Sequence, residues 1–147
     1  MRAYKATLLF IFLLSFSFVN AQSDKVLGIW YNGEKDAKVE IFKNGTKYFG
    51  RVVWMEKPLN DQGKEAVDEK NPDPEKRNVK IMYLVFMKNF TYDSNSNQWT
   101  GGEIYDPKNG KTYSCKMKLS SDNHLEVRGY IGISMLGRTE HWERTKL

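Results

Sequence analysis

The residues that could act chemically are few and scattered. Only two histidines occur, His124 and His141, and a serine–histidine–aspartate arrangement would need one of them fixed beside a nucleophile. His124 follows a predicted turn and His141 has the outward parity of the last predicted strand, which favours surface positions for both. The single cysteine, Cys115, is in step with Tyr113 and Met117, which favours packing over reactivity. The sequence therefore contains no clear catalytic constellation.

Asp106 is the carboxylate with the most suggestive position. It precedes Pro107 at the end of a predicted strand, where the mouth of a barrel would lie. It could bind a ligand or serve as an acid–base group, but an aspartate there commonly accepts backbone N–H groups of its own turn, which we favour. Asp68 and Asp73 could bind a cation, but neighbouring lysines neutralise them and no calcium-loop spacing is present. We expect no metal and no cofactor.

Aromatic residues make up 14% of the chain, enough to fill a core or to line a pocket. An eight-stranded barrel is narrow enough to be filled by its own side chains, yet it can also hold one small ligand. For the second case we expect a ligand-binding set of Trp54, Trp99, Tyr105, Asp106 and Tyr113, with Trp30 as a further lining candidate. Five glycines inside predicted strands would leave space or mark bends: Gly50, Gly101, Gly102, Gly129 and Gly132.

Predicted strands position these residues. Tyr113, Cys115, Met117 and Leu119 alternate with polar residues, the period-two pattern of a strand with one buried face. About eight such strands follow one another: 25–31, 37–43, 46–55, 80–91, 98–105, 111–119, 124–132 and 138–145. Short turns between them favour antiparallel neighbours and an all-β fold, either an up-and-down barrel or a sandwich. The apolar run 81–87 is also compatible with a short buried helix.

The N-terminus predicts export. Arg2 and Lys5 precede the uncharged apolar run 7–19, and Ala21 ends a site suited to signal peptidase. The run is shorter than the roughly 20 residues that cross a bilayer, although an uncleaved anchor is an alternative. We expect residues 1–21 to be a signal peptide cleaved after Ala21, and residues 22–147 to form one barrel domain in the periplasm or outside the cell.

The charge of the chain and the composition of its long loop limit the classes of binding partner that the sequence predicts. Without Arg2 and Lys5 the chain has 21 basic and 18 acidic residues, a net charge of +3. No clustered basic stripe predicts nucleic-acid binding, and no segment after residue 21 is long and apolar enough to span a membrane. The segment 56–79 is half charged and contains three prolines, so we expect a long loop that serves as a lid or a binding loop, or has no specific role. The sequence leaves the oligomeric state open.

Two short motifs at the ends of the predicted barrel resemble the signature of lipocalins and other calycins. Gly28-Ile29-Trp30 opens the first strand and Trp142-Glu143-Arg144 closes the last. The resemblance implies that Trp30 plugs one end of a barrel, with Arg144 packed across its ring, where a cation gains about 0.5–2 kcal/mol. Arg138 shares the parity of Arg144 and is a competing candidate. Gly28, Trp30 and Arg144 are thus the expected closure residues.

Nearly all of the chain after the signal segment also resembles the bacterial domain-of-unknown-function 2147 family. The blocks that carry the resemblance are Gly28-Ile29-Trp30, Asn71-Pro72-Asp73, Trp99-Thr100-Gly101-Gly102, Ile104-Tyr105-Asp106-Pro107 with Gly110-Lys111-Thr112-Tyr113, Arg128-Gly129-Tyr130-Ile131-Gly132 and Gly137-Arg138-Thr139. The family pattern continues with Arg-x-Arg-Pro-Leu/Ile-x-Gly. This chain keeps Arg77 but has Val79, Lys80 and Tyr83 at the later Arg, Pro and Gly.

Three functions remain after these observations. The first is an exported small barrel that binds a small apolar or amphipathic ligand in the cell envelope, with the segment 56–79 as a lid. The second is a protein-interaction module of the envelope that uses the same segment. The third, ranked lowest, is an enzyme with Asp106 or a histidine as its acid–base group.

Overall fold

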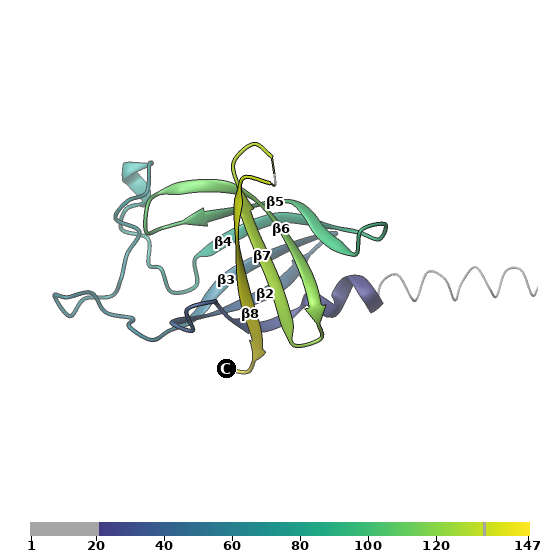
Figure 1. Ribbon diagram of the computed structural model, residues 1–147. Helices are drawn as coiled ribbons and strands as arrows, with labels where there is room; N and C mark the ends of the chain where they lie inside the picture. Colours follow the sequence, from purple (N-terminus) through teal and green to yellow (C-terminus); the bar gives the residue numbers. More distant parts are fainter. Residues whose placement is uncertain (1–20, 134) are drawn as a thin grey trace, which may run out of the picture.

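The computed structural model describes residues 21–133 and 135–147, so the predicted signal peptide lies outside the described residues except for Ala21. Eight antiparallel strands form a closed barrel in which each strand pairs with the next and β8 returns to β1 (Figure 1). The strands are β1 (Gly28–Tyr31), β2 (Ala37–Asn44), β3 (Lys47–Met55), β4 (Val85–Asp93), β5 (Gln98–Asp106), β6 (Lys111–Ser121), β7 (His124–Tyr130) and β8 (Gly137–Thr145). The predicted all-β, up-and-down antiparallel barrel is confirmed.

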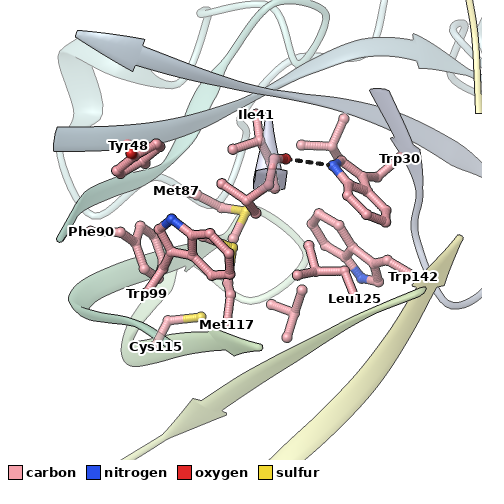
Figure 2. Close-up of a cluster of buried hydrophobic side chains, with 13 residues drawn as sticks. Trp30, Ile41, Tyr48, Met87, Phe90, Trp99, Cys115, Met117, Leu125 and Trp142 are labelled. Carbon is pink, nitrogen blue, oxygen red and sulfur yellow. Dashed lines mark hydrogen bonds between the residues drawn. The ribbon is translucent and has the colours of Figure 1, made fainter. Parts of the chain in front are cut away.

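Alternation of side chains builds the core. In β7, Leu125 and Val127 are buried inside the barrel, while Glu126 and Arg128, which alternate with them, are only partly covered. Burial of each large apolar side chain stabilises the fold by about 1.5–3 kcal/mol. The buried cluster of Figure 2 includes Trp30, Ile41, Tyr48, Met87, Phe90, Trp99, Cys115, Met117, Leu125 and Trp142.

The segment before β1 covers one end of the barrel. A short 3-10 helix, η1 (Asp24–Val26), places the Val26 side chain in the core at 0% exposure. Two indoles hold this segment: Trp30 Nε1 donates to the Val26 carbonyl (2.9 Å, Figure 2), and Trp99 Nε1 donates to the Ser23 carbonyl (3.0 Å). Both indole N–H groups are therefore satisfied although their rings are buried. We call this the closed end.

Two strands begin three or more residues later than predicted. The first predicted strand, 25–31, begins only at Gly28, because the residues before it turn in η1 and Leu27 N donates back to the Asp24 carbonyl (3.1 Å). The predicted strand 80–91 begins only at Val85. Its first residues form a turn in which Leu84 N donates to the Ile81 carbonyl (3.0 Å). Among the described residues, no helix has the length and apolar character needed to traverse a bilayer.

Candidate functional site

Trp30 and Arg144 face each other at the closed end. The two residues are directly paired between β1 and β8, and the Arg144 guanidinium carbon lies 4.1 Å from the centroid of the Trp30 ring. Arg144 Nη1 and Nη2 donate to the carbonyls of Leu27 and Lys25 (2.8 and 2.6 Å), and its Nε donates to the Asp122 carbonyl (2.7 Å). Burial lowers the pKa of Arg144, but a guanidinium remains charged in proteins. One cation thus joins the chain before β1 to the β6–β7 turn.

Three glycines lie directly against larger side chains of other residues. Gly28 has a φ of +129°, and a Cβ on it would lie 2.9 Å from Arg144 Nη1, so both conformation and space require glycine there. A Cβ on Gly102 would overlap the Phe90 ring, and Gly50 is covered by a core methionine in the same way. These strand glycines therefore make room for the core and not for a ligand.

Trp99 lies in the closed-end core. Its side chain is 1% exposed, and its ring contacts Tyr48 (centroids 6.3 Å apart) and Tyr92 (5.1 Å). It has no part in the cavity described below, and neither has Trp30. This corrects the expectation that Trp99 and Trp30 line a pocket: η1 closes the barrel over both rings, which leaves them no open space.

Trp54 lies on the outer face because β3 contains a bulge. Val39 pairs with Val52, but Lys38 pairs with Trp54, so Val53 is an extra residue in β3. The extra residue reverses the alternation, and Trp54 faces outward with Lys38, whose Nζ lies 5.5 Å from the indole centroid. Trp54 is 36% exposed and does not border the cavity, which corrects its predicted interior position.

A cavity of about 940 Å³ occupies the other end of the barrel, which we call the open end. Its apolar wall combines inward-facing side chains of five strands: Val39, Val52, Phe86, Ile104 and Val127, with Trp142 toward the closed end. Gly129 also borders it, and the nearest atoms to a Cβ built there lie 3.6 and 3.8 Å away. The volume falls in the range of sites that hold one small organic molecule.

Two charged residues of β8 border the cavity. Glu140 is partly buried, and its Oε2 accepts a hydrogen bond from Trp142 Nε1 (3.1 Å). Arg138 lies two residues nearer the mouth and is exposed; its guanidinium makes no hydrogen bond or ion pair with the residues that the structure describes. Arg138, which competed with Arg144 for the closure role, thus lies at the open end and far along β8 from Trp30.

Asp106 and Tyr113 border the cavity from the β5–β6 turn. Asp106 Oδ1 accepts the Lys108 N–H (2.9 Å) and Oδ2 accepts from Asn109 Nδ2 (2.9 Å), so the carboxylate caps its own turn, as we favoured from the sequence. The same amide donates to the Tyr113 hydroxyl (3.0 Å). Both side chains are therefore held in place at the rim.

Tyr105, the third predicted residue on the cavity, fastens the long loop to the barrel. Its hydroxyl donates to Oδ1 of Asp68 (2.7 Å), and Asn71 Nδ2 donates to Oδ2 (2.6 Å), so that the Asp68 carboxylate is satisfied at 1% exposure. Burial and the bond to Asp68 raise the pKa of Tyr105 to about 12. This role of Asp68 was not predicted from the sequence. The Asn71-Pro72-Asp73 block nearby was the available signal.

The segment 56–79 borders the open end and is ordered against it. Asp73 caps the 3-10 helix η2 (Pro74–Lys76) by accepting the Glu75 N–H (3.1 Å), and Lys70 Nζ donates to the Lys108 carbonyl (2.8 Å). Glu56, Lys57 and Val67 line the cavity.

An ion pair crosses the rim. Lys108 Nζ lies 3.2 Å from Glu34 Oε2 and 4.0 Å from Asp36 Oδ2, and so joins the β5–β6 turn to the β1–β2 connection. The hydrogen bond to Glu34 raises the pKa of Lys108. Because these side chains are largely exposed, the pair contributes about 1 kcal/mol at most.

The remaining reactive residues lie away from this cavity. Cys115 is buried in the core, and burial raises the pKa of its thiol to about 12, so it stays protonated. His124 and His141 are exposed, and His124 Nδ1 lies 2.9 Å from Ser121 Oγ in the β6–β7 turn. Among residues 21–133 and 135–147, no three His, Cys, Asp or Glu side chains gather so that they could hold a metal ion.

Comparisons with known proteins agree with this architecture. Protein HP1028 from the human pathogen Helicobacter pylori, described as belonging to the lipocalin family, has a solved structure similar to this barrel, with a TM-score of 0.70 and 24% sequence identity over 82% of this chain and 83% of that chain. At that identity the likeness shows the fold alone. No curated protein matches the sequence. The model of a family described as an uncharacterized protein conserved in bacteria (DUF2147) matches residues 28–144, and the chain therefore belongs to that family.

Proposed function

We propose that the barrel binds one small apolar or amphipathic molecule in its open-end cavity, and that it does so in the cell envelope. The observation that carries the proposal is the contrast between the two ends. Large side chains and η1 fill the closed end, whereas a cavity of about 940 Å³ with apolar walls remains at the other. Apolar surface transferred from water into such a cavity gains about 25 cal/mol per Å².

The polar groups define how an amphipathic molecule would lie. Its apolar part would contact Phe86, Ile104 and Val127 in the depth of the cavity. An anionic group would lie at the mouth, where Arg138 has no carboxylate partner among the described residues. The opposite orientation would bring the anionic group toward Glu140, whose like charge disfavours it.

Mass spectrometry under native conditions tests the proposal directly. Protein purified from its own cell envelope is expected to retain a small molecule that dissociates on denaturation. Gly129→Phe would place a ring in the cavity and abolish retention. A Cβ at this position meets no atom closer than 3.6 Å, so β7 can carry the larger side chain, but the cavity cannot hold both the ring and a ligand. His141→Phe adds the same ring to the outer face of β8 and should retain the molecule as the wild type does. Equal retention by both variants would place the molecule elsewhere and refute the proposal.

Export is a separate part of the proposal. The closed-end hydrogen bonds to the segment before β1 begin at Ser23, so cleavage after Ala21 would leave them intact. Determination of the N-terminus of the protein in the envelope fraction should give Gln22 as the first residue. A chain that retains residues 1–21 and stays in the cytoplasm would contradict export without bearing on the cavity.

A further inference from the structure

The connection between β7 and β8 exposes apolar side chains that the described parts of the fold leave uncovered. Ile131, Ile133, Met135 and Leu136 are 69%, 60%, 83% and 74% exposed, although each could be buried in a core. We call residues 131–133 and 135–137 the β7–β8 tip; it projects beyond the strands at the upper edge of the view in Figure 1. A contiguous group of this kind on a soluble surface commonly marks a site of contact with a partner or a membrane.

The charged residues of the β7–β8 connection and its flanks are cations, whereas the carboxylates that border the cavity belong to other segments and to Glu140. From Val127 to Thr139 the chain contains Arg128 and Arg138 and no carboxylate. Arg128 lies at the base of the tip, where its Nη1 donates to Thr139 Oγ1 (2.8 Å) and its Nη2 donates to the Met135 carbonyl (3.3 Å). Apolar side chains at a tip with guanidinium groups at its base suit a surface that is anionic outside and apolar beneath. A layer of anionic phospholipid headgroups has that combination.

The tip is continuous with the mouth of the cavity. Ile131 and Leu136 line the cavity as well as the tip, whereas Ile133 and Met135 belong to the tip alone. We propose that the β7–β8 tip docks the open end of the barrel onto the surface of a bilayer that contains anionic phospholipids. Exchange of a ligand between that bilayer and the cavity rests on the proposed function; docking itself does not.

Flotation with vesicles tests docking in the full mature chain. We expect the wild type to float with vesicles of phosphatidylethanolamine and phosphatidylglycerol, and to float less with vesicles of phosphatidylcholine alone or at high salt. The double variant Ile133→Asn/Met135→Asn should bind the anionic vesicles about tenfold more weakly or worse, because it removes two side chains available for insertion. Its thermal unfolding should match the wild type, since both side chains are exposed.

Two control variants separate docking from other effects. Leu147→Asn removes a leucine that is 80% exposed beyond the end of β8 nearest the closed end, and should float as the wild type does. Gly129→Phe should also float, because it fills the cavity and leaves the tip intact. Failure of the wild type to float with anionic vesicles, or equal flotation of the double variant, would overturn docking. So would a dimer without lipid that the double variant abolishes, since a second copy would then cover the tip.

Discussion

At the scale of single residues, Tyr83 holds a backbone conformation that usually belongs to glycine. Its φ is +67°, and its amide donates to the Val52 carbonyl (2.9 Å) across to β3. A positive φ costs a non-glycine residue on the order of 1 kcal/mol. The side chain is 67% exposed, so its packing offsets little of that conformational free energy. The resemblance to the family pattern implies glycine at this position, which the positive φ would explain.

We therefore expect Tyr83→Gly to stabilise the protein. Relief of the backbone strain should raise the midpoint of thermal unfolding by about 3–5 °C, as follows from roughly 1 kcal/mol in a domain of this size. Tyr83→Ala is the matched control, since it removes the same ring but keeps a Cβ in the left-handed region. Differential scanning calorimetry compares the two. Equal midpoints for both variants would show that the backbone carries no strain at this residue.

In contrast to Tyr83→Gly, substitution of Arg144 at the closed end should destabilise the protein. Arg144→Gln removes the cation over the Trp30 ring and leaves carbonyls of the segment before β1 without their donor. We expect a loss of about 2–4 kcal/mol in the free energy of unfolding, measured with urea, because the hydrogen bonds from a charged donor and its contact with the Trp30 ring are lost together. Arg138→Gln changes the same residue type at the open end and should cost less than about 0.5 kcal/mol. Similar losses of unfolding free energy in the two variants would show that Arg144 does not stabilise the closed end as inferred.

At the scale of elements, the strands were predictable where alternation is strict and not where the register shifts. Cys115 and Met117 in β6 and Leu125 and Val127 in β7 are buried as their parity predicts. In β3, parity fails at Trp54, since nothing in the local sequence shows that Val53 is the extra residue of a bulge. A bulge depends on the partner strand, so one strand read alone cannot reveal it.

Local sequence also could not predict the contacts that hold the long loop to the barrel. Composition predicted an irregular segment at 56–79, and the turn-capping role of Asp106 followed from local chemistry. The bond from Tyr105 to Asp68 joins residues 37 positions apart, and a charged loop gives no sign that one of its carboxylates is buried. The rim of the cavity was thus predictable in its turns but not in what fastens the loop to them.

Tyr105→Phe tests how the loop is held. At neutral pH the variant should lose about 1–3 kcal/mol of unfolding free energy, because the buried carboxylate of Asp68 loses a donor. Folding raises the pKa of Tyr105 from an ordinary value of 10 to about 12, so the native state binds this proton more tightly. The contribution is therefore complete below pH 10 and declines as the pH rises toward 12.

The difference in stability between the wild type and Tyr105→Phe should accordingly shrink over that alkaline range. Urea unfolding at a series of pH values measures it, and limited proteolysis within 56–79 should accelerate in the variant. Tyr130→Phe, at another tyrosine that borders the cavity, should alter neither. A difference that stays constant from neutral pH to pH 12 would mean that Tyr105 does not ionise later in the native state.

At the scale of the whole molecule, one closed sheet joins two ends of different character. The closed end combines buried aromatic rings with the donors of Trp30, Trp99 and Arg144. The open end has a cavity, a rim held by exposed ion pairs, and the exposed β7–β8 tip. Because buried contacts set the free energy of local opening, the two ends should open with different free energies although the strands run through both.

Hydrogen exchange monitored by mass spectrometry tests this division. Peptides from β1 and from the first residues of β7 should exchange only through global unfolding, so that their opening free energy falls with urea as the global value does. Peptides covering 80–84 and the β7–β8 tip should exchange through local openings that urea affects little. Gly129→Phe should slow exchange around the cavity and leave the closed end unchanged, because the added ring supplies contacts only at the open end. Uniform protection along β7 and β8 would mean that the barrel opens as one unit and that the cavity costs the open end no stability.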